Sequence, residues 1–262
     1  MSERLQHPPH WEQVLETALN LPGRAGETYS RFRTLSLGNQ ALLLMQGVIE
    51  PVHTFKGWPD LNRHVKKGSK AKSIYVPMFR RQENESGDEE RRLSGFKLVN
   101  CMFAVSDTEG DDLPEYEAPT WSKERALGSL AISEIAYESI NGNAQGYSHG
   151  REFAVNPVAV YPFKTMQHEL SHIVHGHTTE ERLQEYRVHR GLYEFEAEGS
   201  AYLIMNELGA TDQFDADESR HYIQSWLRDQ QPDEKSIRSV FSTADKIIKV
   251  GRPTETKEGD EA

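Results

Sequence analysis

Apolar residues recur at intervals of three and four along much of the chain, which is the period of an amphipathic helix. The clearest case is residues 162–175, whose apolar stripe consists of Phe163, Met166, Leu170, Ile173 and Val174. The same period predicts further helices at about 9–20, 29–47, 58–66, 121–141, 192–208, 215–229 and 234–250. Apolar runs rich in β-branched and aromatic residues predict strands at 72–79, 95–105 and 151–155. The pattern predicts an α+β fold, in which a small α+β domain precedes a mainly helical domain with a short sheet.

Polar stretches separate these elements. Residues 82–92 and 252–262 are dense in charge and predict loop-like or disordered segments. Residues 108–120 are acidic and contain two prolines, as expected of a connector. The predicted organisation is a domain at 1–110, a linker at 111–120, a second domain at 121–251 and an acidic tail at 252–262.

Charge is unevenly distributed along the chain. Residues 1–82 carry 12 Lys and Arg against 6 Asp and Glu, a net charge of +6, whereas the remainder carries 18 against 35, a net charge of −17. The overall charge of −11 therefore conceals a basic N-terminal part. This asymmetry indicates two units with different partners.

The apolar runs are short, and there is a single cysteine. No stretch has the length or hydropathy of a signal peptide or membrane span, so we expect a cytoplasmic protein with no membrane partner. Cys101 lies in the apolar run 98–105, which predicts a buried strand thiol and excludes a disulfide within the chain.

The predicted helix at 162–175 carries the sequence H-E-L-S-H, with His168 and His172 at its ends and Glu169 after the first histidine. A proline at the first helical residue and a glycine just beyond the last mark both ends of this helix. At 3.6 residues per turn, the two imidazoles project side by side and can reach one zinc ion. The motif predicts a zinc hydrolase, and two surface histidines on an amphipathic helix are the simpler alternative.

A third metal ligand is expected on the next predicted helix, because catalytic zinc sites have three protein ligands and one open position. Glu194 and Glu198 lie one turn apart on the same helical face, whereas Glu196 points away from both. We predict Glu194 as the ligand and Glu198 as the acceptor for the second ring nitrogen of a zinc histidine. The swapped assignment stays open. The remaining nearby histidines are expected to be surface or helix-dipole groups: His175, His177, His189 and His221.

This ligand set predicts hydrolytic chemistry. Zinc lowers the pKa of a bound water and polarises a substrate carbonyl, and Glu169 is the expected general base. A donor to the developing oxyanion is also needed, and the sequence does not choose among Tyr147, His149, Tyr193 and His221. The predicted strand at 151–155 is either an edge strand that pairs with a peptide substrate or an ordinary core strand.

The segment from residue 53 to residue 81 combines positive charge with aromatic rings. It contains eight basic residues and one acidic residue. Cationic groups can follow the phosphates of a single-stranded nucleic acid while aromatic rings stack on its unpaired bases. The residues expected to form such a surface are Arg31, Lys56, Trp58, Arg63, Lys66, Lys67, Lys70 and Lys72. A core tryptophan beside a solvated lysine turn is the simpler interpretation.

Several sequence runs, in the same order along residues 25–250, resemble ArdC-type antirestriction proteins. In the N-terminal part they are YSRF at 29–32, LGNQALL at 37–43, TFKGW at 54–58, VKKG at 65–68 and FAVSDTEG at 103–110. In the C-terminal part they are TMQHELSH at 165–172, EFEAEGSA at 194–201 and YIQSWL at 222–227.

The resemblance implies an N-terminal single-stranded-DNA-binding domain and a C-terminal zincin-like metallopeptidase domain. It also implies a protein of plasmids, phages or integrative elements that protects incoming DNA from restriction, with its third ligand in a Glu-x-x-x-acid helix. We therefore predict single-stranded DNA as a partner, a protein or peptide as a substrate, and zinc or another divalent metal as the cofactor. The alternative is a non-enzymatic DNA-binding protein with a structural or vestigial metal site.

Overall fold

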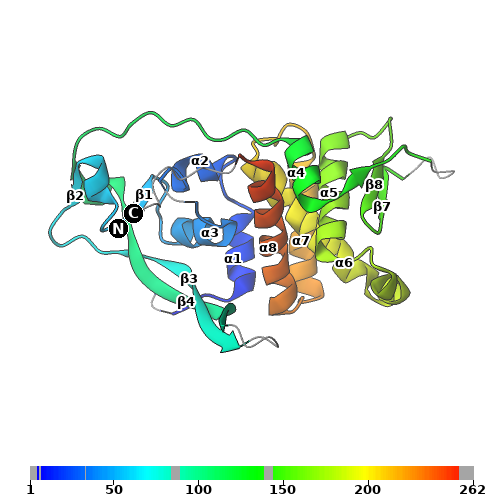
Figure 1. Cartoon of the computed structure of the whole chain (residues 1–262), viewed down its shortest axis with the longest axis horizontal. Coiled ribbons are helices and arrows are strands. Elements are labelled where there is room, and N and C mark those ends of the chain that lie inside the picture. Colours follow the sequence, from blue (N-terminus) through cyan, green and yellow to red (C-terminus); the bar gives the residue numbers. More distant parts are fainter. Residues whose placement is uncertain (1–4, 6, 33, 84–88, 139–143, 254–262) are drawn as a thin grey trace. The chain divides into compact units, whose positions relative to one another are not determined.

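The computed structural model describes residues 5, 7–32, 34–83, 89–138 and 144–253 (Figure 1). The chain separates into two compact units. Unit 1 comprises Met1–His10 with Gly26–Tyr116, and unit 2 comprises Trp11–Ala25 with Glu117–Ala262. Both units contain helices and sheet, so the predicted α+β class is confirmed.

Unit 1 is built on a three-stranded antiparallel sheet in the order β1-β4-β3, with helix α3 packed against β3. A second antiparallel pair joins β2 to β5. The elements are α2 (Ala25–Tyr29), α3 (Leu37–Met45), β1 (Val52–Thr54), the 3-10 turn η1 (Trp58–Leu61), β2 (Arg63–Val65), β3 (Lys72–Glu83), β4 (Glu89–Ala104), the 3-10 turn η2 (Val105–Asp107) and β5 (Thr108–Gly110). The core includes Leu42, Val52, Trp58, Ile74 and Met102.

A capping serine divides the region that the periodicity predicts as one helix at 29–47. The Ser36 hydroxyl accepts a hydrogen bond of 3.3 Å from the Asn39 amide and so begins α3. Such a cap satisfies one of the amide groups that a new helix leaves without a partner. The prediction of a single helix was therefore wrong between Tyr29 and Ser36.

The predicted helix at 58–66 was also wrong. Only the short turn η1 forms, and Asn62 ends it in the left-handed region at φ 54°. The chain then enters β2, where Arg63 pairs with Gly110 of β5. Tertiary strand pairing thus overrides the local helical period.

Strands β3 and β4 form a long hairpin that extends beyond the predicted strands at 72–79 and 95–105. Pairing continues to Glu83 and Glu89, with a bulge between Met78 and Phe79. The predicted loop at 82–92 was therefore wrong for its described residues, and residues 84–88 of that prediction lie outside them.

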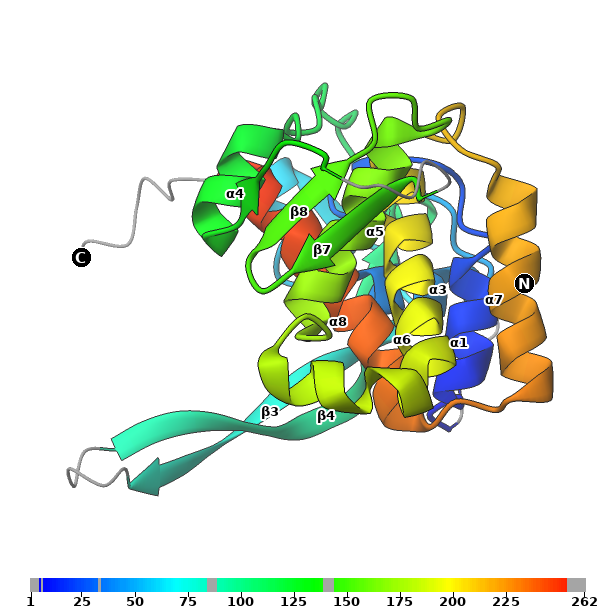
Figure 2. The same ribbon diagram turned by 90° about the vertical axis from the view of Figure 1, so that its right-hand side faces the viewer.

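Unit 2 is mainly helical with a short sheet, as predicted. Helix α5 packs on α6, α6 packs on α8, and the strands β7 and β8 lie against α5 (Figure 2). The elements are α1 (Trp11–Ala18), α4 (Lys123–Leu130), β6 (Ser133–Glu134), β7 (Gly146–His149), β8 (Glu152–Val155), α5 (Pro162–His175), α6 (Glu180–Glu207), α7 (Ala216–Asp229) and α8 (Glu234–Gly251).

The sheet of unit 2 has the order β6-β8-β7, so β8 is its central strand. Of the two interpretations of residues 151–155, the edge strand was wrong and the core strand is confirmed, because β8 pairs with β6 on one side and β7 on the other. The strand at the edge beside α5 is β7. Its first residue must be small, because a Cβ atom at Gly146 would lie 2.7 Å from Thr165 of α5.

Helix α4 is shorter than the predicted helix at 121–141. It ends at Leu130, and Ala131 adopts a left-handed conformation at φ 51° that turns the chain toward β6. Residues 139–143 lie outside the described residues. Backbone geometry at one residue therefore ends a periodic pattern that continues in the sequence.

Residues Trp11–Ala25 belong to unit 2. The predicted domain at 1–110 placed them in the N-terminal domain instead. The Trp11 ring lies 5.5 Å from the ring of Phe241, and the Tyr202 hydroxyl donates a 2.7 Å hydrogen bond to the Leu19 carbonyl. These contacts correct the predicted boundary, because α1 contributes its apolar face to the core of the C-terminal helices.

The other helix predictions agree well with unit 2. Helices α5, α7 and α8 match the predicted 162–175, 215–229 and 234–250 to within one residue, whereas α6 begins well before the predicted residue 192. Within the described part of the chain, no helix is both long and apolar enough to cross a membrane. Residues 254–262 of the predicted tail lie outside the described residues.

Candidate metal centre

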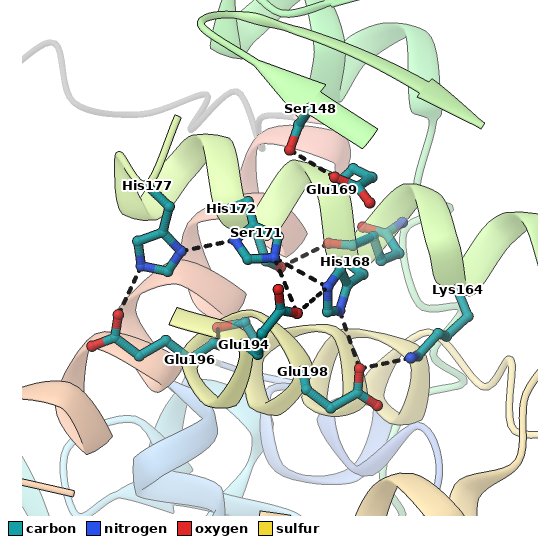
Figure 3. Close-up of polar contacts among 12 residues, drawn as sticks. Ser148, Lys164, His168, Glu169, Ser171, His172, His177, Glu194, Glu196 and Glu198 are labelled. Carbon is teal, nitrogen blue, oxygen red and sulfur yellow. Dashed lines mark hydrogen bonds and ion pairs between the residues drawn. The ribbon is translucent and has the colours of Figure 1, made fainter. Parts of the chain in front are cut away.

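Three side chains converge between α5 and α6 (Figure 3). The Nε2 atoms of His168 and His172 are 3.1 Å apart. An oxygen of Glu194 lies 3.2 Å from Nε2 of His168 and 3.6 Å from Nε2 of His172. The structure therefore brings together the three residues that the sequence predicts as ligands, and their binding of a metal stays a prediction.

Nε2 of His168, Nε2 of His172 and an oxygen of Glu194 form a triangle of donor atoms, called here the donor triangle. It has the dimensions of a divalent metal site. A tetrahedral zinc ion bound at about 2.0–2.1 Å holds its ligand atoms about 3.3–3.4 Å apart. The three separations of 3.1, 3.2 and 3.6 Å bracket that value. Two imidazole nitrogens and one carboxylate oxygen are also the donor types that zinc and similar ions accept, so the residues fit such an ion.

Electrostatics favour a positive charge within this triangle. Burial opposes the ionised form of Glu194, but its close contacts with the imidazoles of His168 and His172 outweigh burial and lower the pKa of Glu194. Burial likewise disfavours protonated His168, yet hydrogen bonds to Glu194 and Glu198 raise its pKa to about 9. The carboxylates are therefore ionised and attract a cation.

Glu198 supports His168 from behind. Its Oε2 atom lies 3.1 Å from Nδ1 of His168 and 2.6 Å from Nζ of Lys164. Burial raises the pKa of Glu198, but hydrogen bonding to His168 and the charge of Lys164 lower it to about 2. This is the arrangement that the sequence predicts for the outer acceptor, because it leaves Nε2 of His168 facing the triangle.

Two histidines expected to be surface or helix-dipole groups lie near His172, with His177 buried and His175 half-buried. Nδ1 of His177 lies 3.0 Å from Nδ1 of His172, and Nε2 of His177 lies 2.8 Å from Glu196. His175 bonds the hydroxyls of Ser200 and Ser239. Burial lowers the pKa of both His175 and His177, which are therefore neutral. The expectation was therefore wrong for His177, whereas His175 is half-buried in the last turn of α5.

A reversal of the chain at Gly176 explains the position of His177. Gly176 adopts φ 79° at the end of α5, and the amide of His177 then donates a 3.0 Å hydrogen bond to the His172 carbonyl. A left-handed glycine commonly ends a helix in this way. The glycine signals the helix end in the sequence, but no sequence signal indicates that His177 returns to His172.

Glu169, the predicted general base, lies in the wall of a cavity beside the triangle. It is buried, and the Ser148 hydroxyl of β7 donates a 2.6 Å hydrogen bond to its Oε2 atom. The cavity has a volume of about 570 Å³ and is also lined by His168, His172 and Glu194. The carboxylate of Glu169 and the donor triangle thus line one cavity that has space for a substrate.

The cavity distinguishes among the predicted oxyanion donors. Tyr147 lines it, whereas His149, Tyr193 and His221 are not in its lining. Tyr193 instead stacks on His177 at a ring separation of 4.2 Å. Tyr161 and Arg190 also line the cavity. The sequence did not single them out, because they come from separate elements and belong to no motif.

Three residues of the predicted nucleic-acid surface are held within unit 1. Trp58 is fully buried and donates a 3.2 Å hydrogen bond to the Phe103 carbonyl, so its ring cannot stack on a base. Lys72 is buried and pairs with Asp107 at 3.1 Å. Arg63 bonds the Thr108 hydroxyl at 2.9 Å and nearby carbonyls. The assignment to the surface was wrong for Trp58 and Lys72, which are buried, whereas Arg63 is half-buried and its guanidinium is engaged by bonds within unit 1.

The other predicted cations are better placed for a ligand. Lys56, Lys66, Lys67 and Lys70 are exposed on turns of unit 1. Arg31 is half-buried, with its guanidinium over the rings of Phe32 and Tyr116. Phe55 is 61% exposed beside Lys56 and is not among the residues predicted for this surface. The exposed aromatic ring in the TFKGW run is therefore Phe55 and not Trp58.

Comparison with known proteins agrees with this architecture. Residues 4–105 match the family model described as the N-terminal domain of anti-restriction factor ArdC. No curated protein sequence matches the chain. Two crystal structures of antirestriction ArdC from the R388 plasmid have a similar fold. The metal-free structure is 17% identical with a TM-score of 0.52 and covers 92% of this chain and 94% of its own.

The Mn(II)-bound structure of R388 ArdC is 18% identical, with a TM-score of 0.53, and covers 92% of this chain and 96% of its own. At these identities the likeness establishes the fold. The family model adds a match in sequence to the N-terminal part. Residues 4–105 thus match the ArdC N-terminal domain, and 92% of the chain has the fold of the R388 ArdC structures.

Proposed function

We propose that the chain is an ArdC-type antirestriction protein that binds single-stranded DNA through unit 1, protects that DNA from restriction, and has a metal-dependent peptidase site in unit 2. The convergence of His168, His172 and Glu194 carries the enzymatic part of the proposal. The second candidate is a non-enzymatic DNA-binding protein in which the same residues hold a structural metal.

A divalent metal is the proposed cofactor. The donor triangle supports it, and the R388 ArdC protein has been crystallised with Mn(II). Two histidines and a glutamate are also the ligand set of a common class of catalytic zinc site. We therefore propose zinc as the cofactor, with manganese as the principal alternative.

The chain's own residues suit hydrolysis of a peptide. A divalent ion held by the triangle would supply a Lewis acid that polarises a carbonyl and lowers the pKa of water. Glu169 is fixed by Ser148 in the cavity wall and would accept the proton of the attacking water. Glu198 and Lys164 hold His168 in the orientation that exposes Nε2.

The strand β7 offers a way to bind an extended substrate. Its Gly146, Tyr147 and Ser148 line the cavity, and in the described part of the chain it is the terminal strand of its sheet. A peptide backbone can add to such an edge by strand pairing. We propose that the substrate lies along β7, with its scissile carbonyl directed toward the donor triangle.

For DNA binding we propose a surface in unit 1 that differs in part from the surface predicted by the sequence. Lys56, Lys66, Lys67 and Lys70 would contact phosphates, and the exposed ring of Phe55 would stack on a base in place of Trp58. The match to the ArdC N-terminal domain supports a DNA-binding role for this region.

The deciding experiment compares wild type with His168→Ala and Glu169→Gln. Metal content after dialysis tests the triangle, and equal metal in wild type and His168→Ala would refute the site. Glu169→Gln should retain metal and DNA binding but lose cleavage of a fluorescent casein substrate. If incoming DNA is still protected from a restriction enzyme in this variant, antirestriction does not depend on hydrolysis and the second candidate accounts for it.

A further inference from the structure

We infer that His177 and Glu196 act with His172 as a hydrogen-bonded relay that fixes the orientation and tautomer of this ligand. The inference rests on the proposed metal site and adds two positioning residues to it. Neither His177 nor Glu196 belongs to the donor triangle. They act on it through the ring of His172 (Figure 3).

The relay is a continuous chain of short polar contacts. Nδ1 of His172 lies 3.0 Å from Nδ1 of His177, and Nε2 of His177 lies 2.8 Å from Oε2 of Glu196. All three side chains are buried. Because buried polar groups that lose a partner are costly, each contact constrains the next.

The contacts fix where each proton lies. Glu196 is a carboxylate acceptor, so His177 must carry its proton on Nε2 and present a lone pair at Nδ1. His172 must then donate from Nδ1, which leaves the lone pair of Nε2 free to face the triangle. This is the tautomer that a metal ligand needs. If His177 donated to His172 instead, Nε2 of His172 would carry the proton. Nε2 of His177 would then present a lone pair to the Glu196 carboxylate, which is also an acceptor.

Ring packing holds His177 in this position. Its imidazole lies between the rings of His175 and Tyr193, with centroid separations of 4.9 and 4.2 Å and interplanar angles of 4° and 13°. His175 is held in turn by the hydroxyls of Ser200 and Ser239. The position of His177 is therefore set on both faces and at both nitrogens.

A second metal site is the competing explanation for this cluster, because His175, His177 and Glu196 also lie near one another. Ring geometry argues against it. An imidazole binds a metal in its own plane, and the planes of His175 and His177 are stacked and nearly parallel, so their lone pairs do not converge. Both nitrogens of His175 are also engaged by serine hydroxyls.

The two histidine ligands are thus supported in different ways. His168 contacts Glu198 directly, and Lys164 balances the charge of that carboxylate. His172 reaches Glu196 only through the neutral ring of His177. Loss of His177 should therefore affect metal binding even though His177 is not a ligand.

The test is a metal titration of the full chain, with zinc and a competing chromophoric chelator at fixed pH. His177→Phe keeps an aromatic ring in the stack but removes both polar contacts, and it should weaken zinc binding by about 10–100-fold. His177→Asn offers an oxygen near the former Nδ1 position and should recover much of that loss. Glu196→Gln removes the charge that sets the direction of the relay and should weaken binding less than His177→Phe.

His175→Phe is the matched control, because it keeps the aromatic ring that stacks on His177 but removes the polar contacts to Ser200 and Ser239. Its zinc affinity should fall by much less than the loss of about 10–100-fold expected for His177→Phe. Equal losses in His175→Phe and His177→Phe would overturn the relay in favour of a merely structural role. Two zinc ions per chain would overturn it in favour of a second site.

An independent measurement avoids substitutions altogether. Nitrogen-proton correlation spectra of histidine-labelled wild type should show His177 protonated at Nε2 and His172 at Nδ1 when zinc is bound. The Nδ1–H tautomer at His177 would refute the relay. A wild type that binds no metal would instead refute the proposed function, so the two failures are distinguishable.

Discussion

Ser148 donates a 2.6 Å hydrogen bond from the edge strand β7 to Glu169 on helix α5. The bond links the strand along which a substrate is proposed to lie with the carboxylate proposed as the general base. Glu169 is therefore oriented by the sheet as well as by its own helix.

Replacing Ser148 by Ala should slow hydrolysis without removing metal. A hydrogen bond to a charged group contributes about 1.5–3 kcal/mol, so kcat on a casein substrate should fall about tenfold or more. Ser148→Thr retains the hydroxyl and is the matched control. Unchanged kcat in Ser148→Ala would show that the bond does not orient the base.

The two carboxylates on one face of α6 should differ in their effect on metal binding. Glu194→Gln removes a proposed ligand and should abolish stable binding of zinc. Glu198→Gln weakens only the support of His168 and should reduce affinity by about 10–100-fold. Zinc affinities from chelator competition measure both, and the opposite ranking would assign the ligand role to Glu198.

Bound metal should stabilise unit 2, because its ligands lie on two helices that unfolding separates. Zinc at a hundred times its Kd should add about 2.7 kcal/mol to the free energy of unfolding. Chelator should therefore lower the Tm of wild type measured by calorimetry. The Tm of His168→Ala should change little when chelator is added. An equal fall in Tm in both proteins would place the stabilising ion elsewhere.

Phe55 and Trp58 should respond in opposite ways to replacement by Ala. Trp58 is 0% exposed, so Trp58→Ala should destabilise unit 1 by about 3–5 kcal/mol. Phe55→Ala should leave stability nearly unchanged but weaken binding of single-stranded DNA by about 1–3 kcal/mol. Urea unfolding and fluorescence anisotropy measure the two effects. Ile49, which is 69% exposed, provides the control Ile49→Ala for loss of a surface apolar group.

The lysine turn should account for part of the salt dependence of DNA binding. Each phosphate contact to a single strand contributes about 0.7 to the slope of log affinity against log salt. Replacing Lys66, Lys67 and Lys70 together by Ala should therefore lower this slope by up to about 2. The matched control replaces three exposed lysines of α8, namely Lys235, Lys246 and Lys249. A slope that changes only in the control would move the DNA surface away from unit 1.

The sequence predicts those parts of the site that depend on local geometry. Helix α5 was predicted residue for residue because Pro162 and Gly176 mark its ends. The positions of Glu194 and Glu198 follow from helical spacing alone, and the structure places them on the expected face. These features require only the neighbouring residues of one element.

Tertiary contacts determine the features that the sequence does not predict. Trp58 looked suited to an exposed surface, and its burial depends on packing within unit 1. The contact of His177 with Glu196 joins the turn after α5 to helix α6, and β7 takes its edge position from pairing with β8. A period or motif carries no information about such partners.

Helix α6 carries Glu194, Glu196 and Glu198 within five residues. Glu194 faces the imidazoles of His168 and His172, Glu198 contacts Nδ1 of His168, and Glu196 contacts His177. Inserting or deleting one residue just before Glu194 would rotate all three by about 100° around the helix axis. Substitutions can therefore alter this centre by degrees, whereas a change of length at this point would remove it in a single mutational step.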